Sequence, residues 1–225
     1  LGWRAGLTVL QAQDQAQTPD RVAFTAAVAA MEDGNFDRAA REFAEFQNKF
    51  PESPLRQEAA ERAEQSKGEA QLRRKEYAPA AATFHAFQEA YPASPRAVLA
   101  ALGESTARLK LGEFDQAAQV LTNTNAPFQK ALTAAAPVEL LYRGLMILAE
   151  ARAATKNPDA ALQALDTASK FAKSPLEQWS LQRLAVDILN TAGRADPAIA
   201  AAEKLRELTK EEALKAKRGV PQTTV

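Results

Sequence analysis

Apolar residues recur along this chain at intervals of three and four positions, which is the spacing of a helix with one buried face. No stretch alternates between apolar and polar residues for long enough to predict a strand. Glycine, proline and asparagine interrupt the pattern and leave segments of roughly 12 to 20 residues between them. The pattern predicts an all-α chain with breaks at 34–35, 51–54, 77–79, 92–95, 112, 125–127, 137, 157–158, 174–175, 193 and 196–197.

One arrangement of residues is repeated in three of these segments. An aromatic residue is followed after three positions by an alanine, and after four more by a large apolar residue. These spacings put all three side chains on one helical face, where the alanine lets a partner helix approach and the large residues fill the space beside it. The three copies are Phe36, Ala39 and Phe43, then Tyr77, Ala80 and Phe84, then Phe114, Ala117 and Leu121, each preceded at nine positions by a small residue, Ala27, Gly68 or Ser105.

Two weaker copies continue the series toward the end of the chain. Successive copies start 41, 37, 44 and 37 residues apart. The weaker copies are Pro158, Ala161 and Leu165, then Ala195, Ala198 and Ala202.

The phrases FPESP at residues 50–54 and YPASP at residues 91–95 separate the first three copies. Proline stops one helix and suits the first turn of the next, so we interpret each phrase as the hinge between two helix pairs. Ser53 and Ser94 each precede a proline that can open a helix, and we predict that their hydroxyls cap those helices.

This arrangement resembles the tetratricopeptide repeat (TPR) family, whose helix-turn-helix unit has small residues between its helices, an aromatic opening the second helix and a closing proline. Pro51 and Pro92 match the closing proline. The resemblance implies a right-handed α-solenoid of about five antiparallel helix pairs over residues 19–217, with an N-terminal extension at 1–18 and a tail at 218–225. The intervals exceed the usual TPR period of about 34 residues, which predicts extended helices or longer linkers.

Within this family, the two hinge phrases and the stretch GEAQLRRKEYAPAAATF at 68–84 are similar to a bacterial envelope group. That group includes the lipoprotein of the outer-membrane-protein assembly machine and the periplasmic coordinator of the Tol-Pal system. The resemblance implies export to the periplasm, with the cytoplasm as the alternative, and a scaffold or adaptor role. Arg4 and the apolar stub at 5–10 fit either the end of an export signal or a leading helix.

Composition narrows the classes of partner and chemistry. The 28 basic and 28 acidic residues cancel, which disfavours nucleic acid because phosphate contacts need a local excess of Lys and Arg. Alanine provides 51 of the 225 residues, a composition that favours closely packed helices. Cysteine is absent, so these residues offer no disulfide, thiolate nucleophile, Cys-based metal site or lipid-attachment cysteine. The sequence contains no run of 18 apolar residues, so it predicts no direct membrane span.

Candidate catalytic residues are sparse. His85, the single histidine, stands one position off the predicted buried face and has no neighbouring ligands at metal spacing. The stretch GESTA at 103–107 resembles a serine nucleophile elbow, but it lies inside a predicted helix, whereas an elbow needs a preceding strand. The acidic pair Glu58 and Glu61 is predicted on a solvated helix face. We predict no catalytic residue, no metal and no cofactor, and therefore a protein that is not an enzyme.

By analogy with TPR proteins, the first helix of each pair lines a concave surface that binds other proteins or peptide segments. The predicted surface is a trough of mixed charge with an apolar floor. Its residues are Phe24, Val28, Arg62, Glu69, Arg73, Leu102, Thr106, Lys110, Arg143, Met146, Glu150, Arg183 and Asp187.

The sequence therefore predicts a non-catalytic protein-binding scaffold of the bacterial envelope. A self-assembling repeat module and the N-terminal fragment of a larger TPR protein are the alternatives, and the oligomeric state is left open. Polar side chains along the last predicted helix, Glu203, Lys204, Glu207 and Lys210 among them, predict a capped end that disfavours end-to-end stacking.

Overall fold

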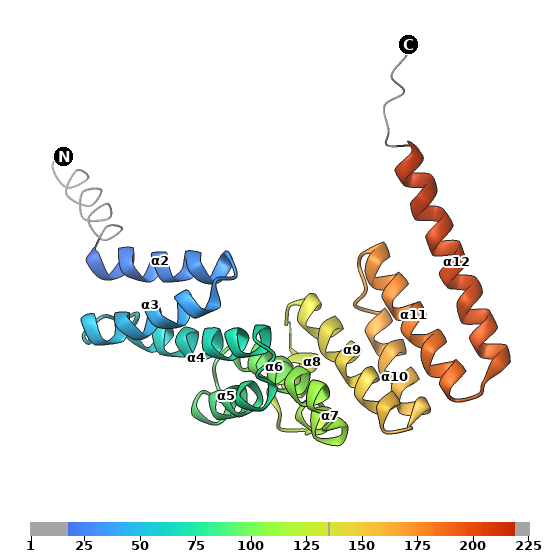
Figure 1. Ribbon diagram of the computed structural model, residues 1–225, viewed down its shortest axis with the longest axis horizontal. Helices are drawn as coiled ribbons and strands as arrows, with labels where there is room; N and C mark the ends of the chain where they lie inside the picture. Colours follow the sequence, from blue (N-terminus) through green and yellow to red (C-terminus); the bar gives the residue numbers. More distant parts are fainter. Residues whose placement is uncertain (1–17, 135, 219–225) are drawn as a thin grey trace, which may run out of the picture. The chain divides into compact units, whose positions relative to one another are not determined.

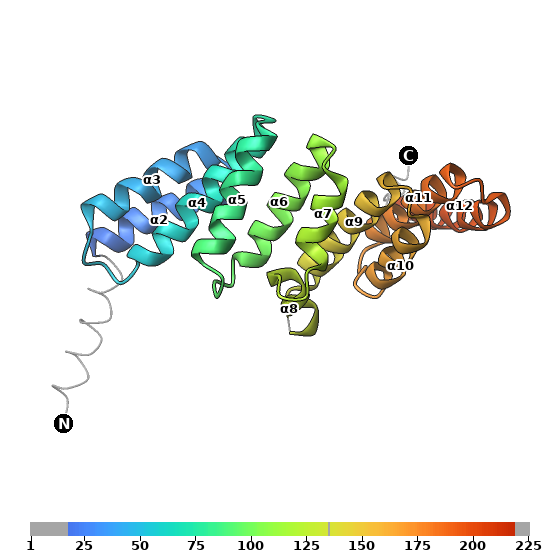
Figure 2. The same cartoon turned by 90° about the horizontal axis from the view of Figure 1, so that it is seen from below.

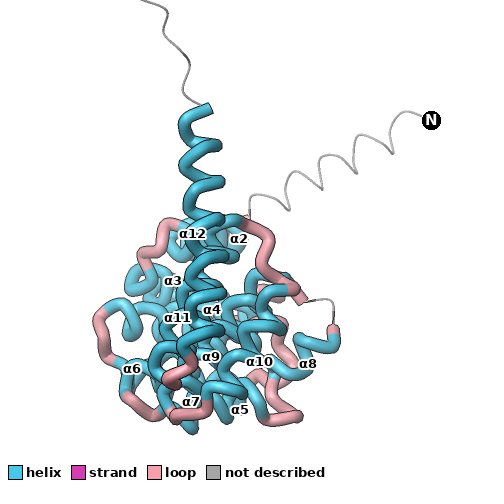
Figure 3. The backbone as a smooth tube through the Cα atoms, turned by 90° about the vertical axis from the view of Figure 1, so that its right-hand side faces the viewer, coloured by secondary structure: helices cyan, strands magenta, loops and turns pink. Residues whose placement is uncertain are grey.

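The computed structural model describes residues 18–134 and 136–218, with side chains described as far as residue 210. Nearly all of the predicted N-terminal extension and tail lies outside the described residues. The described part of the chain contains eleven helices and no strand. Figure 3 shows it coloured as helices and loops. Two compact units follow one another along the chain, the first ending at Ala107 and the second beginning at Arg108.

Unit 1 is built from antiparallel helices joined by short turns. Its helices are α2 (Pro19–Glu32), α3 (Phe36–Lys49), α4 (Arg56–Arg73), α5 (Tyr77–Ala90) and most of α6 (Ala97–Leu111). Figure 1 shows α3 running back along α2 after the tight turn between them. Consecutive helices pack side by side because each buries the apolar stripe that the three- and four-residue spacing creates.

Unit 2 contains the end of α6 and six further helices. They are α7 (Phe114–Thr122), α8 (Pro127–Thr133), α9 (Val138–Ala154), α10 (Pro158–Ser169), α11 (Pro175–Thr191) and α12 (Ala195–Arg218). Figure 2 shows α9 to α12 as neighbours in chain order. The short helix α8 lies between the third and fourth copies of the repeat, which explains the interval of 44 residues there.

The turn between the two helices of a pair has the same backbone conformation in all five copies. The residues with positive φ are Gly34, Lys75, Gly112, Lys156 and Gly193, between 58° and 80°. At each turn the residue with positive φ donates its N–H to the carbonyl three positions back, and the next residue donates to the carbonyl five back. This pair of bonds is a Schellman motif, which satisfies the last carbonyls of the first helix. The two weaker copies are therefore genuine repeats in the backbone.

The repeated alanines and large apolar residues form the contacts between helices. Both contact positions of the first three copies are fully buried, as is Ala161 of the fourth, with Leu165 5% exposed. In the fifth copy the prediction of Ala202 is wrong: Ala201 is buried in its place and packs with Ala198 against Leu189. A spacing of three from Ala198 reaches the same helical face as a spacing of four.

The hinge serines do not cap helices, so that prediction is wrong. Helix α4 begins at Arg56 with Leu55 at its N-cap and no side-chain cap bond. Instead, the Ser53 hydroxyl donates to Asp20 Oδ2 at 2.6 Å and accepts the Leu55 N–H at 3.2 Å. Each hinge folds back toward the first helix of the preceding pair. This places its serine beside an acidic residue 33 positions earlier in the sequence.

The second hinge repeats this arrangement. The Ser94 hydroxyl donates to Glu61 Oε2 at 2.7 Å and accepts the Arg96 N–H at 3.1 Å. Glu61 is buried at 8% exposed, so the prediction that it sits on a solvated face is also wrong. Hydrogen bonds from Ser94 and from the Gln57 amide offset the cost of burying its carboxylate.

Candidate protein-binding surface

The residues predicted for a binding surface all lie on first helices of the pairs. In unit 1 they come from α2, α4 and α6, and in unit 2 from the end of α6, α9 and α11.

Phe24 and Arg62 meet in unit 1 although they are far apart in sequence. The Arg62 guanidinium carbon lies 5.4 Å from the centre of the Phe24 ring, within range of a cation–π contact. Phe24 packs edge-on against Phe43 and Phe46, which fixes its orientation. The Arg62 side chain is 18% exposed and donates to Glu58 Oε1 at 2.8 Å. Phe24, Arg62 and Glu58 therefore form a partly buried contact in unit 1.

Arg96 and Gln65 complete this part of the surface and were not predicted. Arg96 Nη1 donates to Gln65 Oε1 at 3.2 Å, and its Nη2 lies 3.4 Å from the same Glu58 oxygen that Arg62 contacts. Burial and the neighbouring Arg62 charge lower the pKa of Arg96. The contacts with Arg62 lower the pKa of Glu58. The i, i+4 pair of Glu58 and Arg62 was readable in the sequence, but the approach of Arg96 across the hinge was not.

Three further predicted residues of unit 1, Arg73, Leu102 and Thr106, are engaged within the fold. Arg73 Nη1 donates to the carbonyl oxygen of Gly34 at 2.7 Å, and its guanidinium carbon lies 4.5 Å from the Phe36 ring centre. Arg73 thus joins the second repeat to the turn of the first. Leu102 is 0% exposed and offers no surface to a partner, so it does not line an accessible floor. Thr106 donates its hydroxyl to the carbonyl of Leu102 at 2.7 Å, while Val28 and Glu69 are half-buried.

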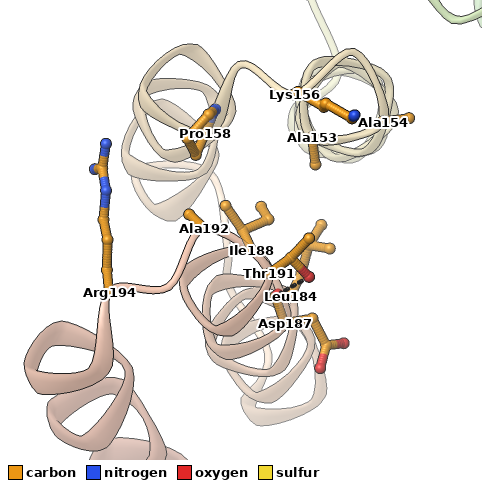
Figure 4. A pocket seen from close by; sticks show the side chains of 10 residues that line it. All are labelled: Ala153, Ala154, Lys156, Pro158, Leu184, Asp187, Ile188, Thr191, Ala192 and Arg194. Atoms are coloured by element: carbon orange, nitrogen blue, oxygen red, sulfur yellow. Dashed lines mark hydrogen bonds between the residues drawn. The ribbon is translucent and has the colours of Figure 1, made fainter.

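In unit 2 a cavity of about 650 Å³ opens between α9, α10 and α11. Figure 4 shows Ala153 and Pro158 on one side, with Leu184, Ile188 and Thr191 of α11 on the other. Lys156, Asp187 and Arg194 add charge to its lining. An apolar wall with a few charged groups and this volume suits one or two side chains of a bound segment. We call it the α9–α11 cavity.

Asp187 is the predicted residue that lines this cavity. Arg183, Arg143, Met146 and Glu150 occupy the same two first helices outside the lining, with Arg183 Nε 4.0 Å from Asp187 Oδ2. The apolar lining residues Leu184 and Ile188 were not predicted. Their i, i+4 spacing was visible, but it also fits a helix contact, and only the packing leaves Leu184 half-buried at an opening. Lys110 is exposed at the end of α6.

A second charged pair fixes one edge of the same cavity. Arg194 Nη1 donates to Asp159 Oδ1 at 2.7 Å, and this contact lowers the pKa of Asp159 while it raises that of Arg194. A matching ion pair in unit 1 joins Arg74 to Asp37 in the first turn of α3. Both pairs connect a turn to the first turn of the preceding second helix.

The candidate chemical residues occupy structural positions. His85 is exposed on α5, and its Nδ1 lies 3.3 Å from Oε1 of Glu104, which is 2% exposed on α6. Ser105 of the GESTA stretch is fully buried within α6, as expected for a small contact residue. Among the side chains described, at 18–134 and 136–210, no group of three or more acidic or histidine residues could hold a metal ion. Of the helices described, none combines the length and apolarity needed to cross a membrane.

Comparisons with known proteins agree with this architecture. A family model described as "Tetratricopeptide repeat" matches residues 22–53 and 66–94, which hold the first two repeats of unit 1. No curated protein sequence matches the chain. The matched stretches in unit 1 therefore resemble tetratricopeptide repeats.

Two solved structures have a similar fold over most of this chain. One is a MamA RS-1 ArsTM double mutant, 16% identical, with a TM-score of 0.63, covering 86% of this chain and 96% of that one. The other is MamA 41-end from Desulfovibrio magneticus RS-1, 18% identical, with a TM-score of 0.58, covering 86% of this chain and 95% of that one. At these identities the likeness concerns the fold, and the predicted all-α class of antiparallel helix pairs is confirmed.

Proposed function

We propose that this chain is a non-catalytic scaffold that binds a segment of a partner protein in the α9–α11 cavity. The observation that carries the proposal is an opening with an apolar wall and a charged edge between two successive first helices. TPR-type repeats support it, because stacked helix pairs present a preformed surface and so lower the ordering cost of docking. The cavity anchors an apolar side chain, and Lys156 and Asp187 orient polar groups beside it.

The test uses two exposed alanines of unit 2. Ala154 lines the α9–α11 cavity at the end of α9, whereas Ala200 is exposed on α12 outside it. A photo-crosslinking amino acid is placed at either position in cells of the source organism, and crosslinked proteins are identified by mass spectrometry. We expect a specific partner at position 154 and not at position 200.

The same positions then test affinity with the purified partner. Ala154→Trp fills the cavity and should weaken binding at least about tenfold by isothermal titration calorimetry. Ala200→Trp is the matched control and should leave the dissociation constant unchanged. Equal affinity for both variants and the unaltered chain would reject this cavity as the docking site.

We further propose that the scaffold acts in the bacterial envelope, in the periplasm. Support comes from the hinge phrases at 50–54 and 91–95 and from the export-signal reading of Arg4 and residues 5–10. Cell fractionation with an antibody against the chain tests this, with periplasmic and cytoplasmic marker proteins as controls. Recovery with the cytoplasmic marker alone would reject the periplasmic placement and leave the binding proposal standing.

A further inference from the structure

A second cavity in unit 2 shares no lining residue with the α9–α11 cavity. It has a volume of about 500 Å³ and lies between α11 and α12. We call it the Trp179 cavity. Its lining consists of Trp179, Ala202, Leu205, Arg206, Thr209 and Lys210.

The apolar surface continues beyond the Trp179 cavity along both helices. Leu176 lies three residues before Trp179 and is 72% exposed, and Ile199 lies three residues before Ala202 and is 60% exposed. Residues three apart share a helical face, so each exposed side chain extends the lining of its own helix. Exposed large apolar side chains that flank an apolar cavity mark an interaction surface. The predicted polar cap of α12 therefore covers only part of that helix.

The charged side chains around the Trp179 cavity are predominantly basic. Arg206 and Lys210 are the charged residues of its lining, and the Arg183 guanidinium carbon lies 5.8 Å from the Trp179 ring centre. Glu207 Oε1 lies 2.9 Å from Lys210 Nζ and 3.8 Å from Arg206 Nη2. The side chains of this triplet are all more than half exposed, and such exposed pairs contribute little free energy. The two cations are therefore available to an incoming anionic group.

We propose that the Trp179 cavity binds an amphipathic helix of a partner protein, with a large apolar side chain flanked by Asp or Glu. The groove between two antiparallel helices accepts a third helix, whose apolar residue enters beside Trp179 and Leu205. The acidic residues of the bound helix then pair with Arg206, Lys210 and Arg183. This proposal stands independently of the α9–α11 cavity.

Trp179 provides its own probe for this binding event. The sequence contains two tryptophans, so Trp3→Phe leaves Trp179 as the single source of tryptophan fluorescence. The ligand is a synthetic helical peptide of about four turns, with leucines along one face and glutamates beside them. Its control carries lysine at every glutamate position. We expect a saturable change in Trp179 emission with the acidic peptide, a response at least about tenfold weaker with the basic one, and weakening of the acidic response by salt.

Matched charge reversals on one helix test the assigned contacts. Arg206→Glu combined with Lys210→Glu should weaken acidic-peptide binding at least about tenfold. Lys204→Glu alters an exposed cation of α12 outside the cavity and should have little effect. Ala202→Leu should abolish the response by filling the cavity without adding a second tryptophan, and circular dichroism checks that every variant remains helical. Equal binding of both peptides, or no effect of the double reversal, overturns the proposal.

Two other occupants give different results in the same assay. A second copy of this chain would change Trp179 emission and light scattering with protein concentration, without peptide. An anionic membrane would produce a response to phosphatidylglycerol vesicles that exceeds the response to the acidic peptide. Either result, with no response to the acidic peptide, overturns the assignment of a partner helix.

Discussion

The ring of Phe84 occupies the space where a side chain at position 68 would begin. A Cβ placed on Gly68 would lie 2.6 Å from Phe84 Cε1, and one placed on Gly103 would lie 2.5 Å from Phe84 Cε2. One aromatic ring of α5 is thus held between glycines of two first helices, α4 and α6. Gly68 is the small residue that the repeat places nine positions before Tyr77, and its lack of a side chain lets the Phe84 ring approach closely.

Gly68→Ala should destabilise unit 1 although alanine favours helices over glycine by about 1 kcal/mol. The added methyl group forces the buried Phe84 ring to shift, and overpacking of this kind costs about 1–3 kcal/mol. We expect a lower midpoint in urea unfolding monitored by circular dichroism. Phe84→Leu is the partner for a double-mutant cycle, in which the combined loss should be smaller than the sum of the single losses. Additive losses would show that the two residues do not crowd each other.

The two hinge serines should differ in their effect on stability. Ser94→Ala removes a donor from the buried Glu61 carboxylate, at a cost of about 1–3 kcal/mol. Ser53→Ala is the matched change in the first hinge, where water can replace the hydroxyl at Asp20, so its effect should be smaller. Urea unfolding of the two variants measures this difference. A larger loss for Ser53→Ala would contradict the role assigned to burial.

The left-handed turns predict a stabilising substitution. Lys75 has a φ of 61°, a conformation that costs a non-glycine residue about 1–2 kcal/mol. Lys75→Gly relieves this cost but gives the unfolded chain more conformational freedom, which offsets about 0.4–1 kcal/mol of the gain in stability. We expect a net gain of roughly 0.5–1 kcal/mol, measured as a higher thermal midpoint.

Gly193→Lys is the reverse control in unit 2. A Cβ at Gly193 would meet nothing within 4 Å, so the expected loss comes from the backbone alone.

Gly34→Ala should cost more stability than Gly193→Ala, because the Cβ at position 34 would lie 2.8 Å from Arg73 Nη2 and disturb that side chain's contact with the turn. Equal losses at both glycines would show that Arg73 moves aside freely.

The N-terminus of α11 predicts an acid-dependent contribution to stability. The N–H groups of Ser174 and Lys173 each donate to Glu177 Oε2 at 2.8 Å, which lowers the pKa of this carboxyl below its ordinary value of 4.5. Because the folded pKa is lowered, the stabilisation is complete above the ordinary pKa and is lost as the pH falls through the lowered value.

Glu177→Gln should therefore flatten the pH dependence of unfolding. The unaltered chain should lose more stability than this variant between about pH 6 and about pH 3, measured by thermal unfolding at each pH. Glu203→Gln changes an exposed glutamate of α12 and serves as the control. Parallel profiles for the unaltered chain and Glu177→Gln would contradict the capping contribution.

Local sequence patterns were sufficient for much of the fold. The positions of Gly34, Gly112 and Gly193 predicted turns, and the triplets beginning at Phe36 and Tyr77 predicted buried faces, because helix periodicity and backbone preference act over a few residues. Polar side chains were harder to assign. The spacing that places Glu61 on a helix does not reveal that Ser94 folds back over it.

The candidate surfaces show the same division. Sequence alone determined that the chain forms antiparallel helix pairs and which helix comes first in each, since the repeated spacing is a local property. Tertiary structure decided that Arg73 is bound to the Gly34 turn and that Leu102 is buried. It also decided that openings remain beside Leu184 and Trp179, because an opening depends on how completely neighbouring helices cover each other, and residues far apart in sequence set that coverage.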